Sequence, residues 1–206
     1  MRDVADDLLH WWESGATAGL ATVVATFDSA PRLPGAAMLV GPEGTVIGSV
    51  SGGCVEGAVY ELASGIAGGD PPVLQRYGVS DDDAFAVGLT CGGILDVFVE
   101  PISRQTFPEL AEIVANMHEQ QPVAVATFVD GDPARLGHRL IVWPDRASGS
   151  LGSEGLDVAV TDDARGMLAS GRTGIRRYGP DGERRIDDVA VFVASYAPPP
   201  RMIVFG

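Results

Sequence analysis

Cysteine, histidine and basic residues are all scarce in this sequence, and each shortage narrows what the chain can be. Two cysteines in 206 residues are too few for a disulfide scaffold, and three scattered histidines lack the spacing of a structural zinc site. No apolar run approaches the roughly 20 residues of a membrane span. The 14 basic residues against 28 acidic ones give a formal net charge of −14, which argues against nucleic acid or an anionic membrane as a partner.

The remaining composition is that of a globular protein. Apolar residues make up 46% of the chain and charged residues 20%, so one large domain or two small ones can each bury a core. The first residues do not begin a signal peptide. We therefore expect a soluble, cytoplasmic protein with no membrane span and no nucleic-acid partner.

The stretch from residue 49 to 57 carries two glycines that run into Cys54, followed by a segment, 55–63, that is compatible with a helix. A helix N-terminus leaves backbone N–H groups unpaired and attracts anions, and it also favours the thiolate of a nearby cysteine. The stretch thus predicts an anion cradle with a soft nucleophile inside it. Glu56 either orients or deprotonates a thiol, or is a first-turn carboxylate that matches the helix dipole.

A second thiol lies in a mirrored setting, because Cys91 is followed by Gly92 and Gly93. A cysteine is by default an inert buried residue, but two thiols in glycine-rich loops indicate loops that converge on one pocket. Cys54, Cys91 and Glu56 are therefore the candidate catalytic residues. Arg32, in a loop bounded by prolines, either clamps a phosphate or is a solvated surface charge, and the acidic run 81–83 is expected to be a solvated loop. Thiols beside a phosphate-binding backbone suit a cofactor that is anionic and thiophilic, and molybdopterin fits that description.

Hydrophobic periodicity predicts alternating strands and helices. Helical spacing begins the chain at Val4 and stops near Gly15, and Thr106 with Glu109 has the form of a capping box that opens a helix ending before Pro122. A helix is also expected near 155–169. The expected strands cover 20–27, 36–40, 73–77, 94–100, 124–128, 139–142, 174–178 and 189–193.

An internal repeat runs through most of the chain at an offset of 101 residues. Residues 25–27, 48–49, 58–59 and 76–78 recur at 126–128, 149–150, 159–160 and 177–179. The fold class is therefore α/β: two related halves from an internal duplication (1–103 and 104–196, within a region 1–196), with mixed sheets and flanking helices. The repeat aligns Cys54 with Gly155 and Glu56 with Asp157, so only the first half carries the thiols, which favours chemistry there.

The last residues read as the start of another domain. Three prolines form a stiff linker, and the apolar segment that ends at Gly206 has the form of a first Rossmann strand entering its glycine turn. We expect 197–206 to be a linker and the first strand of a missing Rossmann-like domain. Whether that domain binds a dinucleotide is left open.

Residues 31–40, 48–56 and 88–93 resemble the XdhC/CoxI family, accessory proteins for molybdenum hydroxylases such as xanthine dehydrogenase. The resemblance implies a carrier, expected as a homodimer, that binds molybdenum cofactor while a cysteine desulfurase supplies its sulfur, and then delivers it to the apo-enzyme. It places Cys54 and Cys91 at the molybdenum, with no metal held by protein ligands alone. Where the family often has a basic residue, this chain has Ala37, and the repeat puts Arg139 at the matching position. The implied cofactor-binding residues are Arg32, Pro34, Gly35, Ser51, Gly52, Gly53, Cys54, Glu56, Thr90, Cys91, Gly92 and Gly93.

Two other functions remain open at this point. One is an enzyme, either a thiol or persulfide transferase or a nucleotide-dependent oxidoreductase that uses the missing domain. The other is a pure interaction module, which would leave the glycine-flanked thiols unexplained. The thiol pattern favours a cofactor carrier over a catalyst.

Overall fold

The computed structural model describes residues 1–27, 30–78 and 93–198. Thr90, Cys91, Gly92, the acidic run 81–83 and the final segment 199–206 lie outside the described residues. The first half contains α1 (Ala5–Glu13), β1 (Ala18–Phe27), β2 (Ala37–Val40), β3 (Val46–Gly48), α2 (Glu56–Ala67), β4 (Val73–Tyr77) and β5 (Ile94–Ile102). The second half contains α3 (Leu110–His118), β6 (Val123–Asp130), β7 (Arg139–Val142), β8 (Ala147–Gly149), α4 (Glu154–Ala169), β9 (Gly174–Tyr178) and β10 (Val189–Tyr196).

The two halves repeat one topology, so the α/β fold with an internal duplication is confirmed. The strand order is β3-β2-β1-β5-β4 in one sheet and β8-β7-β6-β10-β9 in the other. The expectation of mixed sheets was wrong, since each strand pair in the described residues is antiparallel. Consecutive strands such as β1, β2 and β3 are joined by loops without an intervening long helix, and such short connections pair strands antiparallel.

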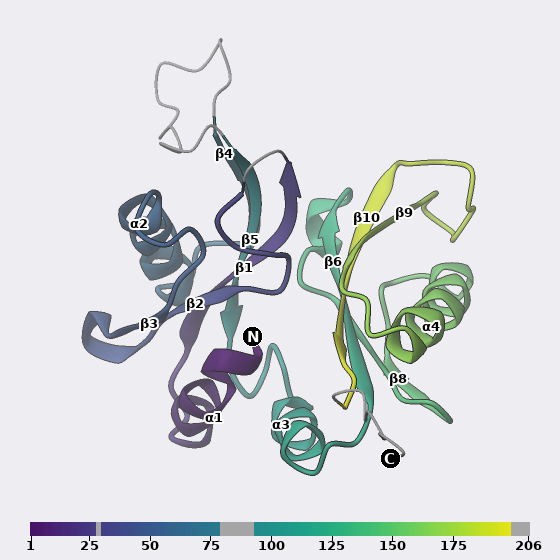
Figure 1. Ribbon diagram of the computed structural model, residues 1–206, viewed down its shortest axis with the longest axis horizontal. Helices are drawn as coiled ribbons and strands as arrows, with labels where there is room; N and C mark the ends of the chain where they lie inside the picture. Colours follow the sequence, from purple (N-terminus) through teal and green to yellow (C-terminus); the bar gives the residue numbers. More distant parts are fainter. Residues whose placement is uncertain (28–29, 79–92, 199–206) are drawn as a thin grey trace, which may run out of the picture.

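The molecule is layered, with the two sheets face to face and one long helix outside each (Figure 1). Alternate residues of β1 show the arrangement: Leu20 and Val24 pack into the core between the sheets, whereas Ala21 and Val23 pack into the core under α2. The core under α4 repeats this plan in the second half. Because the central strands are buried on both faces, they read as continuous apolar runs in the sequence.

Strand register fixes which residues correspond between the halves. Thr22 lies opposite Ala37 on β2, and Thr127 lies opposite Arg139 on β7, so Arg139 occupies the position of Ala37. The offset between the halves is 102 residues for this pair and 105 for the two threonines, so the predicted match of 25–27 with 126–128 at an offset of 101 was wrong. On the other side of the same strands, Leu20 pairs with Glu100 and Val125 pairs with Ala194. Glu100 and Ala194 are therefore also equivalent.

The predicted capping box at Thr106 was wrong, because α3 begins only at Leu110. The Thr106 hydroxyl donates to the Pro101 carbonyl over 2.7 Å and accepts from the Ser103 backbone N–H over 2.9 Å, which closes a turn before the helix. Glu109 precedes the helix without a side-chain capping bond. The Thr106 hydroxyl, which the pattern predicted to cap the helix, therefore forms hydrogen bonds within a local turn instead.

A close approach of β1 and α2 yields a test of this packing. A Cβ built at Gly19 would lie 2.2 Å from the Ala63 carbonyl oxygen. This oxygen belongs to the backbone, which cannot move aside as a flexible side chain can. We expect Gly19→Ala to lower the free energy of unfolding by about 1–3 kcal/mol, measured by urea denaturation. Gly57→Ala, where a Cβ meets no atom of the described residues within 4 Å, is the matched control and should raise stability by about 0.5 kcal/mol. Equal effects of the two changes would contradict the close packing.

Candidate functional site

The loop between β3 and α2 is organised by the carboxylate of Glu56, the first residue of the helix. This carboxylate accepts hydrogen bonds from Ser49 Oγ (2.6 Å), Ser51 N (2.8 Å), Ser51 Oγ (2.5 Å) and Gly53 N (2.8 Å). The side chain therefore reaches back over the loop and satisfies donors at the helix N-terminus. The chain's own glutamate occupies the place where the sequence predicted a bound phosphate.

Three further N–H groups of the loop donate to the two serine hydroxyls. Cys54 N and Val55 N each donate to Ser51 Oγ over 3.0 Å, and Gly52 N donates to Ser49 Oγ over 2.9 Å. The backbone donors that we expected to face a ligand are thus engaged within the loop. Gly52 and Gly53 have φ angles of 76° and 116°, which favour glycine, and a Cβ at either would meet no atom of the described residues within 4 Å.

The pKa of Glu56 decides between its two predicted roles. Burial acts to raise the pKa, but the hydrogen bonds from Ser49 and Ser51 outweigh it and lower the pKa to about 2. A carboxylate this acidic is a poor base at neutral pH. The geometry therefore favours the second role, in which Glu56 is a fixed charge that holds the loop and matches the helix dipole.

The second half contains a copy of this network without the thiol. Ser150 Oγ and Leu151 N donate to the Asp157 carboxylate, each over 2.7 Å, and Gly152 N donates to Ser150 Oγ over 3.0 Å. The carboxylate-anchored loop thus belongs to the duplicated scaffold. A Cβ at Gly155, the counterpart of Cys54, would lie 2.3 Å from the Asp181 carbonyl oxygen. The loop between β9 and β10 leaves no space for a thiol there.

Cys54 itself is half-buried and packs against the core between the first sheet and α2. Gly93 immediately precedes β5, and its carbonyl oxygen would be 2.7 Å from a Cβ at Gly78, so the two ends of this connection are close together. Cys91 lies outside the described residues, and so do Thr90 and Gly92. The convergence of two thiols on one pocket stays a prediction.

The proline-bounded loop forms a separate open depression of about 430 Å³, lined by residues 31–36 together with Arg2 and Asp3. Arg32 is partly exposed, 3.8 Å from the Asp3 carboxylate, and Leu33 at the tip is 79% exposed. The Gly35 N–H donates to the Val23 carbonyl over 2.8 Å, and this hydrogen bond anchors the loop to β1. Arg32, Pro34 and Gly35 therefore share one surface, and no residue of the Cys54 loop lines that depression in the described chain.

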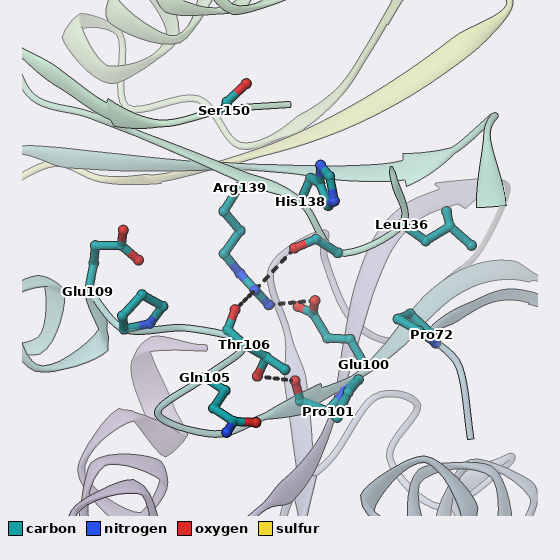
Figure 2. A pocket seen from close by; sticks show the side chains of 12 residues that line it. Pro72, Glu100, Pro101, Gln105, Thr106, Glu109, Leu136, His138, Arg139 and Ser150 are labelled. Atoms are coloured by element: carbon teal, nitrogen blue, oxygen red, sulfur yellow. Dashed lines mark hydrogen bonds and ion pairs between the residues drawn. The ribbon is translucent and has the colours of Figure 1, made fainter. Parts of the chain in front are cut away.

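Sequence reasoning missed a cleft of about 410 Å³ between the two halves (Figure 2). At its floor Arg139 Nη2 lies 2.5 Å from Glu100 Oε2, and both side chains are only 7% exposed. Burial raises the pKa of Glu100, and the Arg139 charge opposes that change. Two features of the sequence could have indicated this pair. Arg139 begins an otherwise apolar strand, and Glu100 lies near the end of another apolar strand.

Two features are absent from the described residues. No cluster of three or more histidine, cysteine, aspartate or glutamate side chains in that part of the chain is arranged to hold a metal ion. None of its helices is both long and apolar enough to cross a membrane. The chemistry of the described site thus rests on one thiol, a glycine-rich surface and a self-capped helix N-terminus.

The acidity of Glu56 makes stability depend on pH. The folded-state pKa of about 2 lies below the ordinary value of 4.5, so its stabilisation is present above about pH 4.5 and is lost as the pH falls toward 2. After allowance for solvent screening we expect about 1–2 kcal/mol. Urea denaturation at pH 7 and pH 3 should show a smaller acid-induced loss in Glu56→Gln than in the unmodified chain. Identical losses in both proteins would contradict this role.

Comparison with characterised proteins places this geometry in context. The chain is 37% identical over 143 residues to a probable xanthine dehydrogenase subunit of Bacillus subtilis, a match covering 65% of this chain and 42% of that protein. It is 34% identical over 112 residues to the molybdenum cofactor insertion chaperone PaoD of Escherichia coli, covering 54% of this chain and 34% of PaoD. The chain thus matches less than half the length of either relative.

The fold has a solved counterpart as well. A crystal structure of a xanthine dehydrogenase from Bacillus halodurans superposes with a TM-score of 0.66 over 94% of this chain and 52% of that one, at 19% identity. At this identity the likeness concerns the fold alone. A sequence profile of the XdhC and CoxI family matches residues 11–78 and 117–179, which together make up more than half of the sequence. The chain belongs to the XdhC and CoxI family.

Proposed function

We propose that this chain acts in the maturation of xanthine dehydrogenase-type molybdenum hydroxylases, as a carrier that holds molybdenum cofactor and delivers it to the apo-enzyme. Membership of the XdhC and CoxI family supports this proposal, as do relatives named as a molybdenum cofactor insertion chaperone and a probable xanthine dehydrogenase subunit. The proposal extends to a cytoplasmic homodimer and to a cysteine desulfurase as the source of the cofactor's sulfur.

The observation that carries the proposal is the placement of Cys54 in one half of a duplicated scaffold. Both halves keep the carboxylate-anchored loop, so the loop serves the fold, whereas the thiol is present in only one copy. Thiolates are soft ligands that suit a thiophilic metal. Among the described residues no atom lies within 4 Å of a Cβ at Gly52 or Gly53, which supports space for a ligand at this part of the loop.

Each residue of the loop has a different part in the proposed carrier. Ser49, Ser51 and Glu56 hold the backbone so that the thiol stays at the start of α2. Because their mutual hydrogen bonds use the loop's N–H groups, the loop contributes its thiol and its glycine surface instead of a phosphate cradle. We propose Cys91, next to Thr90, Gly92 and Gly93, as the second sulfur, with the surface of Arg32, Pro34 and Gly35 as a further contact.

The test measures cofactor retention. The protein in its longest natural form is purified from cells that synthesise molybdenum cofactor, and molybdenum and pterin are quantified per chain. We expect Cys54→Ser to lose both by about tenfold or more, because the sulfur ligand is removed, while Cys91→Ser causes a smaller loss. Ser153→Ala, which alters the cap of α4 in the thiol-free half, is the matched control and should retain the cofactor.

Two results would overturn the proposal. The first is an absence of molybdenum and pterin from the unmodified protein under conditions that load another cofactor carrier. The second is unchanged retention in the Cys54 variant, which would move the binding site away from the glycine loop.

A further inference from the structure

Three buried hydroxyl groups lie around one internal cavity in the core between the two sheets. Thr22 comes from β1, Thr127 from β6 and Tyr196 from the end of β10, and the three residues are only 9%, 6% and 7% exposed. All of them line a cavity of about 30 Å³. Within residues 1–27, 30–78 and 93–198, none of these hydroxyls has a hydrogen-bond partner. Since a hydroxyl removed from bulk water without a partner costs free energy, each of them calls for one.

The duplication accounts for the position of this cavity. Thr22 and Thr127 occupy equivalent positions, so a small cavity that both of them line lies where equivalent points of the two halves face each other. Glu100 and Arg139 also line it, whereas the equivalent positions in the other half carry alanines. Two long polar side chains on one side and two short ones on the other leave a volume that packing does not fill.

The ion pair adds unused hydrogen-bonding groups to the cavity. Arg139 Nη2 lies 2.5 Å from Glu100 Oε2, but the nitrogen is buried and has no partner in hydrogen-bond geometry within the described chain (Figure 2). A carboxylate offers about four acceptor sites, and Arg139 approaches only one of the two Glu100 oxygens. The wall therefore presents an N–H donor, carboxylate acceptors and three hydroxyls that can either donate or accept.

Size and charge narrow the class of ligand that this cavity takes. Pockets for organic ligands measure several hundred Å³, so a cavity of about 30 Å³ excludes them. The charges of Arg139 and Glu100 balance, and burial lowers the pKa of the amino group of Met1, another lining residue, to about 6, so an ion is disfavoured at neutral pH. Water both donates and accepts, and this volume accommodates about two water molecules.

We propose that this cavity is a binding site for about two ordered water molecules, which hydrogen-bond the three hydroxyls to the Glu100–Arg139 pair. Each water donates to the carboxylate or to a hydroxyl oxygen and accepts from a hydroxyl or from Arg139 Nη2. The two sheets are then joined through water in the middle of a core that is otherwise apolar.

The water site lies between two surface features of the molecule. The cavity shares Gly35 with the depression at Arg32, and it shares Glu100 and Arg139 with the cleft between the halves. None of its lining residues belongs to the Cys54 loop, so the inference stands independently of the proposed cofactor site.

Magnetic relaxation dispersion of oxygen-17 in water counts the molecules that reside in a protein for longer than its tumbling time. The protein in its longest natural form is compared with the triple variant Thr22→Val/Thr127→Val/Tyr196→Phe, in which each hydroxyl is removed with little change of shape. We expect the triple variant to hold at least one long-lived water molecule fewer, because the water loses most of its partners.

Urea denaturation of the single variants gives an independent test. If water pairs the hydroxyls, each of Thr22→Val, Thr127→Val and Tyr196→Phe removes a partner from that water and should lower the urea midpoint by about 0.3–0.5 M. The three losses should add up to more than the loss in the triple variant, because all three hydroxyls act through the same water molecules. Thr26→Val, on β1 but outside the cavity, is the matched control and should leave the midpoint unchanged.

Equal numbers of long-lived water molecules in the unmodified protein and the triple variant would overturn the inference. A higher midpoint in all three single variants would do the same, since replacing an unpaired buried hydroxyl with an apolar group of the same shape stabilises a dry cavity. Chloride relaxation that is enhanced by the unmodified protein and not by the triple variant would assign the site to an anion instead. Cys54→Ser should leave the water count unchanged, so failure of the proposed cofactor site and failure of this water site are distinguishable.

Discussion

The packing of the two sheets through their inner faces is the constraint on which the rest of the structure depends. Each half covers the outer face of its sheet with a helix of its own, α2 or α4. The inner faces carry residues such as Leu20, Phe98, Val125 and Phe192, and they cover each other. Burial of apolar surface is the main favourable contribution to folding, so neither half is expected to be stable without the other. The cleft with its ion pair lies at the margin of this shared core.

Duplication lets one half serve as a reference for the other. The loop before each long helix is held by a carboxylate, Glu56 or Asp157, and this shared feature marks the part of the loop that the fold requires. What differs between the halves, Cys54 against Gly155 and the pair Glu100 with Arg139 against two alanines, is not required by the fold. Function is therefore best sought in these asymmetric positions.

The sequence predicted the repeat and most of the central strands because both depend on patterns along the chain. It did not predict β8, since Ala147–Gly149 is a short exposed edge strand without apolar alternation. Antiparallel pairing also escaped it, because an apolar run such as β1 has the same pattern in either kind of sheet. At the site, the predicted helix over 55–63 is present as part of α2. The hydrogen bonds between Glu56 and the serines could not be foreseen, because loop conformation brings those groups together.

The same limit applies to the Glu100–Arg139 pair, whose members are distant in the sequence and meet only when the sheets pack. A repeat alignment can identify Arg139 as unusual, but it cannot name its partner. Fold class followed from local patterns, whereas contacts between the halves required coordinates.

The backbone contact at Gly155 also keeps the two loops different from each other. Since the Asp181 carbonyl fills the space that a side chain would need, the second copy of the loop could regain a thiol only if the connection between β9 and β10 changed at the same time. A single substitution cannot reverse the asymmetry. The site proposed at Cys54 therefore has no second copy at the equivalent loop of the same chain.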